Sequence, residues 1–320
     1  MELSLATAPA YLAARDLEPR HCALLGGGIS NAVILAETNR GTIVLKQSLS
    51  KLRVEQDWFS DRERIHRECE AMRLLAPLLP EGTVPGIVFE DRDNCIFAMT
   101  AAPEPGRPWK SILMAEREAD PLTLTRVASL LANMIAVSVG NSEFQSKFGD
   151  LRVFDQLRLD PYYRATAARH PDLRGFFDEL IAETVERRYS LVHGDWSPKN
   201  LLVSPQQVTA IDFEVVHYGD PSFDVAFLIN HLLLKSLYRE APAYKSAARD
   251  FFAILQFILQ EPWLEAATTR HLGALMLARV DGKSPAEYIH GTALEPRVRE
   301  IARGIILNPQ RSIAETIESV

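Results

Sequence analysis

The sequence lacks the cysteine patterns that mark disulfide-rich or zinc-binding proteins. Among its 320 residues there are only three cysteines, Cys22, Cys69 and Cys95, and no two of them form a CxxC pair. Few and widely spaced cysteines argue against a disulfide framework or a zinc site, and they are typical of reduced thiols in a cytosolic protein. We therefore expect a cytoplasmic protein that is held together by its core.

An excess of basic residues is also missing. The chain has 35 basic and 42 acidic residues and a net charge of -7, so it carries no global footprint for nucleic acid. It contains no uncharged apolar run of about 18 residues and no N-terminal basic segment followed by an apolar core. We expect no nucleic-acid partner, no membrane-spanning helix and no signal peptide. The composition leaves the oligomeric state open.

The chain divides at a proline-rich segment. Residues 101–108 contain three prolines and one glycine, which favours a linker over a helix or strand. Short strands are expected on the N-terminal side, with an amphipathic helix over 62–75, whereas helices dominate beyond the linker except over 191–213. We predict an α+β fold of two lobes. These are an N-lobe with an antiparallel sheet and one helix (1–100), a hinge (101–108) and a mostly helical C-lobe (109–320).

Three polar side chains follow short apolar segments in the second half of the chain. Asp195 and Asn200 lie within HGDWSPKN, and Asp212 begins DFE twelve residues after Asn200. Kinase chemistry needs one group that orients the attacking hydroxyl and two that hold the magnesium bridging the phosphates of ATP. HGD alone would fit a surface turn, and IDF alone would fit a strand end. Their combination in this order favours a phosphotransferase.

A glycine turn near the N-terminus offers a second phosphate contact. Consecutive glycines let backbone N–H groups approach a phosphate closely, although three glycines also make an ordinary hairpin. The candidate residues are Gly26, Gly27, Gly28, Ser30 and Asn31.

Lys46 and Glu68 are candidates for an ion pair at the nucleotide. Lys46 ends the apolar run 42–45, and Glu68 lies on the amphipathic helix beside the apolar Cys69. A lysine at a strand end is usually exposed to solvent. The position of Lys46 after the glycine turn and before the helix favours a phosphate-binding role.

The HGDxxxxN motif, followed by a short strand and an ID-aromatic segment, resembles the aminoglycoside phosphotransferase and choline kinase superfamily. The resemblance extends over residues 22–240 and implies a protein kinase-like fold that uses ATP and Mg²⁺. It implies that Asp195 accepts the proton of the substrate hydroxyl and that Asn200 and Asp212 hold the magnesium.

The same resemblance implies further roles. Lys46 and Glu68 would grip the phosphates under the glycine turn, and the backbone between Met99 and Ala101 would bind adenine. His193 and Asp224 would be structural braces of the catalytic loop.

Two departures separate the chain from protein kinases. Glu214 follows Phe213 where protein kinases carry glycine, and Ser197 stands where they place a lysine against the transferred phosphate. Lys199 is close to that position, and we include it among the catalytic candidates. Both departures favour kinases of small molecules.

The acceptor site is only weakly marked in the sequence. The polar turn over 275–285 makes Arg279 and Asp281 candidate contacts, and Glu214 is a third, although a helix C-terminus with charged residues is an equally good reading of the turn.

Three hypotheses stay open. The chain would be a metabolic kinase acting on a sugar, amino alcohol or similar metabolite, an antibiotic-modifying phosphotransferase, or a pseudokinase that binds nucleotide as a binding module.

Overall fold

The computed structural model describes residues 1–26, 31–49, 62–103 and 106–320, which group into two compact units. The first unit comprises Met1–Glu104 and Thr209–Val215, and the second comprises Pro105–Val208 and Val216–Val320. One boundary falls within the hinge segment 101–108. The segment that carries Asp212 groups with the first unit, whereas the sequence predicts it to be part of the C-lobe.

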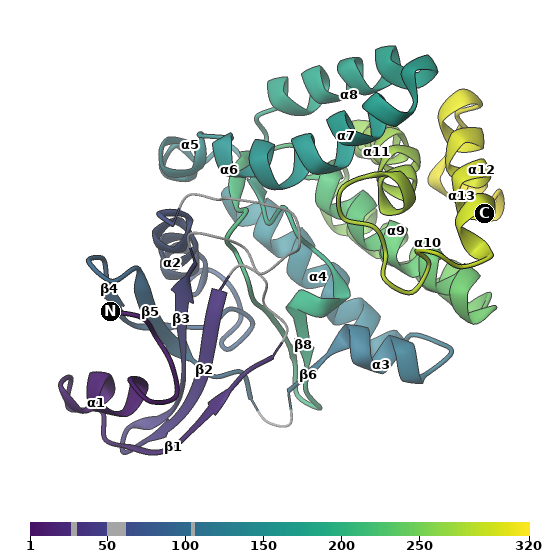
Figure 1. The fold of residues 1–320 in the computed structure, drawn as a ribbon. Helices are drawn as coiled ribbons and strands as arrows, with labels where there is room; N and C mark the ends of the chain where they lie inside the picture. Colours follow the sequence, from purple (N-terminus) through teal and green to yellow (C-terminus); the bar gives the residue numbers. More distant parts are fainter. Residues whose placement is uncertain (27–30, 50–61, 104–105) are drawn as a thin grey trace. The chain divides into compact units, whose positions relative to one another are not determined.

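The first unit is built on a five-stranded antiparallel sheet (Figure 1). Its strands, in spatial order, are β1 (Pro19–Leu24), β2 (Asn31–Thr38), β3 (Gly41–Ser48), β5 (Ile96–Thr100) and β4 (Ile87–Asp91). The predicted hairpin turn joins β2 to β3, with Thr38 opposite Gly41. Gly41 has a φ of +109°, a conformation that glycine adopts without a steric penalty.

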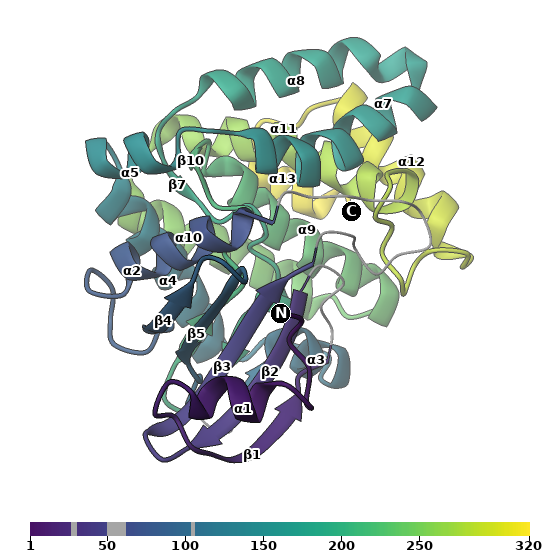
Figure 2. The same cartoon turned by 60° about the vertical axis from the view of Figure 1, so that its left-hand side comes forward.

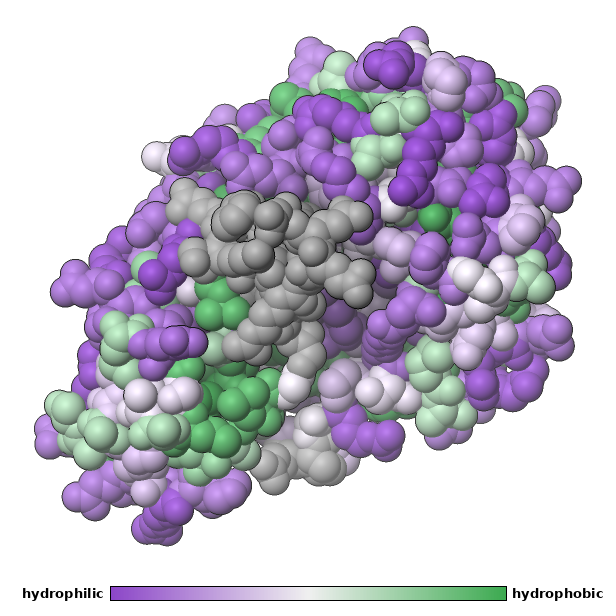
Figure 3. Space-filling model, viewed as in Figure 1, coloured by the Kyte–Doolittle hydropathy of each residue, from purple (hydrophilic) through white to green (hydrophobic). Residues whose placement is uncertain are grey.

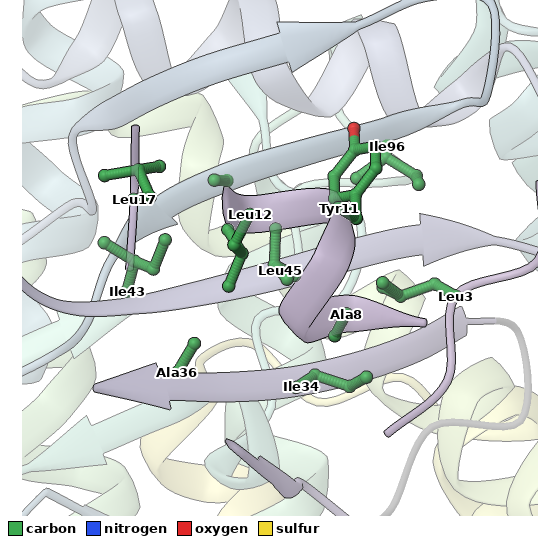
Figure 4. Close-up of a cluster of buried hydrophobic side chains, with 11 residues drawn as sticks. Leu3, Ala8, Tyr11, Leu12, Leu17, Ile34, Ala36, Ile43, Leu45 and Ile96 are labelled. Atoms are coloured by element: carbon green, nitrogen blue, oxygen red, sulfur yellow. The ribbon is translucent and has the colours of Figure 1, made fainter. Parts of the chain in front are cut away.

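Helix α1 (Ala8–Ala13) covers one face of this sheet (Figure 4). Successive side chains of a strand point to opposite faces, so alternate residues of the strands meet the helix. They are Ile34 and Ala36 of β2, Ile43 and Leu45 of β3, and Ile96 and Ala98 of β5. The same alternation turns Val44 and Lys46 towards the opposite face.

Helix α2 (Arg64–Leu75) packs against β3, β4 and β5. The apolar spacing expected from the sequence is confirmed, since Ile65, Cys69, Met72 and Leu75 are all buried. Cys69 therefore points into the unit. Glu68, the residue before Cys69, is also buried.

The second unit is mostly helical (Figures 1 and 2). Its α-helices are α3 (Trp109–Ala115), α4 (Pro121–Ser138), α5 (Ser142–Phe148), α6 (Arg152–Phe154), α7 (Ala165–Arg169), α8 (Arg174–Glu186), α9 (Ser222–Arg239), α10 (Ala243–Leu259), α11 (Pro262–Asp281), α12 (Leu294–Leu307) and α13 (Ile313–Glu318). A π-helical segment, η1 (Asp155–Arg164), precedes α7, and two short 3-10 turns are η2 (Pro171–Leu173) and η3 (Pro198–Asn200).

Short strands lie on either side of the HGD motif. They are β7 (Ser190–Val192), which pairs with β10 (His217–Gly219), then β8 (Leu201–Val203) and β9 (Val208–Ala210). β8 also pairs with the two-residue strand β6 (Arg107–Pro108), so the proline-rich segment does contribute to a sheet, contrary to our expectation. Because proline lacks an N–H, it fits a strand only where its nitrogen does not need to donate a hydrogen bond.

Helix α9 forms the centre of the second unit. It packs against both α10 and α11, and α9 and α11 lie side by side in Figures 1 and 2. All but a few of its residues are buried, including Lys235 near its C-terminal end. Two charged residues of this helix, Asp224 and Lys235, are therefore withdrawn from water.

The surface visible in Figure 3 is mostly hydrophilic, and its main apolar patch lies over the strands of the first unit. Leu24 and Leu25, at the end of β1, are exposed apolar residues in that unit. Among the described residues, one helix, α4, is long and apolar enough to cross a membrane. Because 56% of that helix is buried inside the protein, it also fits the core helix of a soluble protein and is weak evidence for a membrane span.

Candidate active site

Lys46 and Glu68 form the predicted ion pair in the first unit. β3 turns Lys46 towards α2, where its Nζ lies 2.8 Å from both carboxylate oxygens of Glu68. Both side chains are almost completely buried, with exposed fractions of 5% and 1%. A lysine of this kind cannot be an ordinary strand-end side chain, since a buried ammonium group requires a partner.

Asp212 joins this pair. Its Oδ1 lies 2.5 Å from Lys46 Nζ, and the backbone N–H of Phe213 donates to Glu68 Oε1 at 3.2 Å. Asp212 has a φ of +69°, a left-handed conformation that is unusual for a residue other than glycine. A strained backbone at a carboxylate that contacts a buried lysine is typical of a functional site.

Each charged group in this cluster changes the pKa of its neighbours. Although burial alone would lower it, the carboxylates of Asp212 and Glu68 raise the pKa of Lys46, so the lysine is positively charged. Burial raises the pKa of Glu68 above its usual value, and Lys46 opposes that shift. Both carboxylates contact the same ammonium group, and a further cation would be attracted to them.

Glu214, a candidate acceptor contact, instead has partners within the first unit. Its Oε2 accepts hydrogen bonds from Arg64 Nε at 3.1 Å and from Asn31 Nδ2 at 3.0 Å. Arg64 has no exposed side-chain surface. These contacts tie the DFE segment to the start of β2 and to α2, which favours a structural role.

The remaining nucleotide candidates are only partly described. Gly27, Gly28 and Ser30 lie outside the described residues, and a Cβ at Gly26 would meet open space.

The two candidate adenine contacts are placed in the sheet or next to it. Met99 lies inside β5, paired with Val44 on one side and Ile87 on the other, and the N–H of Ala101 donates to the carbonyl of Thr42. The sheet therefore uses the N–H of Ala101.

In the second unit, Asp224 positions the backbone of the HGD motif. It lies in the first turn of α9 and accepts the N–H of His193 at 2.6 Å and that of Gly194 at 2.9 Å. Burial raises the pKa of Asp224 to about 7, against the effect of these two hydrogen bonds. Gly194 has a φ of +76°, and the ring Nδ1 of His193 accepts the N–H of Asp195. The sharp turn places Asp195 at the tip of this loop.

Asp195 is held by two cations. Its Oδ2 lies 3.0 Å from Arg158 Nη2 and 3.0 Å from Lys199 Nζ, and the aspartate is only 5% exposed. Arg158 is itself fixed, because its Nε donates to the carbonyl of Gly194 at 2.6 Å. The carboxylate is thus oriented by a rigid arginine and by a half-exposed lysine.

Arg158 is a site residue that the sequence interpretation missed. It lies in η1, a π-helical segment of a type that is rare and often found at functional sites. The available signal was an arginine between the buried residues Leu157 and Leu159, close to Pro161. Only folding brings it to Asp195, 37 residues further along the chain.

Asn200 is oriented by the same loop. Its Nδ2 donates to the carbonyl of Asp195 at 3.0 Å, which leaves the amide oxygen as the group able to coordinate a cation. An amide oxygen at Asn200 and a carboxylate at Asp212 are both ligand types that Mg²⁺ prefers. The donor chemistry of these residues therefore fits the metal that the sequence predicts.

Arg279 and Asp281 point to different surroundings. Arg279 Nη1 donates to the hydroxyl of Tyr162 at 3.2 Å and to the carbonyl of Ser284 at 2.5 Å. Asp281 is engaged on both oxygens by Arg299, at 2.7 and 2.8 Å, and accepts from His170 Nε2 at 2.8 Å. These contacts favour a structural role for Asp281, whereas no carboxylate in the described part of the chain pairs with Arg279.

We expect Asp281→Asn to lower the free energy of unfolding by about 2 kcal/mol, because Arg299 loses a charged hydrogen-bond partner. Although burial alone would raise it, Arg299 and His170 lower the pKa of Asp281. Its contribution is therefore present above the ordinary aspartate pKa and disappears as the pH falls below it. Urea unfolding at neutral and at acidic pH measures both effects. A variant as stable as the wild type at neutral pH contradicts this role.

Comparisons with known proteins place the chain among phosphotransferases. The profile of the APH phosphotransferase enzyme family matches residues 21–251. Methylthioribose kinase 2 of Oryza sativa subsp. japonica is 26% identical over 263 residues, which cover 74% of this chain and 61% of the relative. Methylthioribose kinase of Bacillus cereus (strain AH820) is 25% identical over 248 residues, which cover 68% and 62%. The chain thus spans about three fifths of the length of these curated relatives.

Solved structures share the fold at low sequence identity. Macrolide 2'-phosphotransferase MphH from Brachybacterium faecium has a TM-score of 0.56 and 19% identity, with 96% of this chain and all of that chain covered. The complex of APH(2")-IIa with streptomycin and ATP has a TM-score of 0.54 and 13% identity, with 99% of each chain covered. These likenesses confirm the predicted α+β, protein kinase-like fold. With the match over residues 21–251, they establish that the chain belongs to the APH phosphotransferase enzyme family.

Proposed function

We propose that this protein transfers the γ-phosphoryl group of ATP to a hydroxyl of a small molecule. The observation that carries the proposal is the contact of the buried pair Lys46 and Glu68 with Asp212. It keeps a lysine charged at a carboxylate whose chemistry suits a metal ion. The second unit adds Asp195, held by Arg158 and Lys199 at the tip of the HGD loop.

In this reaction Asp195 orients the acceptor hydroxyl and takes its proton. The acceptor oxygen forms a bond to the γ-phosphorus, the bond from that phosphorus to the bridging oxygen breaks, and ADP leaves with the electron pair. Asn200 and Asp212 are the proposed magnesium ligands, and the bound ion would neutralise charge on the phosphates. Lys46 would contact the phosphates, with Glu68 fixing its ammonium group.

Lys199 has a further role in this proposal. It is 55% exposed and lies 3.0 Å from Asp195, so it can move between the aspartate and a transferred phosphate. Arg158 cannot do so, because it is buried and bonded to Gly194. We propose Lys199 as the cation that follows the charge of the phosphoryl group, in place of the lysine missing at Ser197.

The small-molecule acceptor is supported by the relatives that are methylthioribose kinases and by Glu214. Glu214 is bonded to Arg64 and Asn31 where a protein kinase has glycine at the base of a mobile loop. The three cysteines are free thiols, which fits a cytoplasmic location.

A screen of hydroxyl compounds for ADP release tests the proposal. Purified protein is incubated with ATP, Mg²⁺ and sugars, amino alcohols, hydroxy acids or aminoglycosides, with the Asp195→Asn protein as blank. We expect one compound class to stimulate ADP release, and chelation by EDTA to abolish the stimulation. ATP-dependent turnover that is equal in the blank would contradict the assignment, and a pseudokinase would show no turnover with any compound.

A further inference from the structure

An ammonium group is buried on α9, and no carboxylate of the described residues pairs with it. Lys235 is 1% exposed, and its Nζ makes one hydrogen bond within the part of the chain that the structure describes, to the carbonyl of His231 at 3.4 Å. Its Nζ also lies 5.4 Å from the ring centroid of Tyr288. Burial of an unpaired ammonium costs several kcal/mol, so a purely structural role is an expensive use of this residue.

The surroundings of Lys235 add positive charge. Arg279 and Lys110 both act on it, whereas Glu287, the acidic group that acts on it among the described residues, is itself paired with Lys110. Burial, Lys110 and Arg279 together lower the pKa of Lys235 to about 7. An anion bound beside Lys235 would offset the positive charge of Lys110 and Arg279 and would favour the protonated lysine.

Polar atoms in this cluster also lack partners. Arg279 Nε and the hydroxyl of Tyr288 are buried and make no hydrogen bond among the described residues. Buried polar groups are normally hydrogen-bonded, and an unsatisfied group in a native structure calls for a ligand or an ordered water. Arg279 Nε and Lys235 Nζ are both donors, and each is able to bond to an oxygen of an anion.

The cluster is continuous with the proposed catalytic residues. Arg158, which pairs with Asp195, has its guanidinium carbon 5.7 Å from the ring centroid of Tyr162, and the hydroxyl of Tyr162 accepts from Arg279. Arg158 and Arg279 lower the pKa of Tyr162, although burial opposes them. Asp195, Arg158, Tyr162 and Arg279 thus form an unbroken series within the second unit.

Helix α9 gives the spacing. Arg158 lies 5.9 Å from the ring centroid of Phe227, and the hydrogen bond to His231 places Lys235 Nζ one turn further along the helix. One turn rises about 5 Å, so the ammonium lies further from Asp195 than Arg158 does, along the same helix.

We propose that Lys235 and Arg279, beside Tyr288, form an anion-binding subsite, and that the acceptor is a small hydroxyl compound carrying a carboxylate or phosphate group. This inference rests on the proposed phosphotransferase function and narrows its acceptor. A polycationic aminoglycoside would meet like charges here, which is unfavourable.

Matched acceptor pairs test the subsite. Gluconate is compared with sorbitol, glycerate with glycerol, and a sugar phosphate with its parent sugar, by ADP release with wild type and Lys235→Met. We expect the anionic member to have the higher kcat/KM, and Lys235→Met to raise its KM by about 10- to 100-fold, as for a lost charged hydrogen bond. KM for ATP and for the neutral member should change less than about threefold. Lys147→Met, which removes an exposed lysine paired with Glu143, is the matched control.

A second readout separates the subsite from the reaction. Inorganic phosphate and acetate are titrated in thermal unfolding of both proteins without ATP. We expect either anion to raise Tm of the wild type but not of Lys235→Met, and the unliganded variant to be at least as stable as the wild type, because it no longer buries an ammonium.

The outcomes distinguish two kinds of failure. If no compound stimulates ADP release but anions still protect the wild type alone, the proposed reaction fails and the subsite stands. Preference for the neutral or cationic compounds, or equal anion protection of both proteins, overturns the subsite.

Discussion

Asp195→Asn is expected to lower kcat for phosphoryl transfer by about a thousandfold, within the range usual for loss of a general base. Asparagine keeps the shape of the side chain but cannot take the proton of the acceptor hydroxyl. It also removes the negative charge that holds Arg158 and Lys199, each 3.0 Å from Asp195 Oδ2. Coupled ADP release measures kcat, and calorimetric titration measures binding of Mg²⁺ and ATP.

ATP affinity should change less than about threefold, because the role proposed for Asp195 is at the acceptor and the phosphates are assigned to other residues. Asp172→Asn is the control. It removes a carboxylate whose ion pair with Arg303 lies at the surface, and its kcat should remain that of the wild type. Wild-type kcat in Asp195→Asn would remove Asp195 from the reaction.

Lys46→Met is expected to lower the free energy of unfolding by about 3 kcal/mol and to weaken ATP binding at least tenfold. The substitution removes the ammonium group that Glu68 and Asp212 both contact, and Glu68 is almost completely buried. Loss of one partner from a buried ion pair costs more than the pair itself contributes. Urea unfolding and calorimetry measure the two effects.

The stability deficit should depend on pH in one direction. Burial raises the pKa of Glu68, and loss of Lys46 removes the group that opposes this shift. A carboxyl with a raised folded-state pKa destabilises the folded protein when ionised, and this penalty is lost as the pH falls through that pKa. We therefore expect the deficit of Lys46→Met to be larger at pH 8 than at pH 5. An equal deficit at both pH values means that carboxylate repulsion is not its cause.

Elements with a local signal were predictable from the sequence. The apolar spacing of α2 and the alternation of β2 and β3 are period-based patterns, so the antiparallel sheet and its helix could be placed before the structure was known. The fold class and the family follow from the HGD and DFE motifs, and both are confirmed. The two-residue strand β6 was missed because the strand it pairs with, β8, is almost a hundred residues away.

Some residues of the candidate site were likewise predictable from the sequence, and others were not. Asp195, Asn200 and Asp212 could be named because three polar groups at short spacing follow buried strands. Asp281 was given an acceptor role from a polar turn, but its contacts with Arg299 and His170 favour a structural one. A charged residue after an apolar helix looks the same in sequence whether its partner is a ligand or another helix.

By itself, the sequence determined the reaction chemistry that this protein can offer, because carboxylates, an amide and a lysine in a fixed order carry that information locally. The small number of cysteines and the lack of excess basic charge argued against disulfide-rich, zinc-binding and nucleic-acid-binding proteins. Only the tertiary structure decided which charges are paired. Arg158 reaches Asp195 from a π-helical segment, and Lys235 is buried with no carboxylate paired to it among the residues that the structure describes. Pairing depends on burial and on distances between residues far apart in the chain, and no spacing in the sequence encodes either.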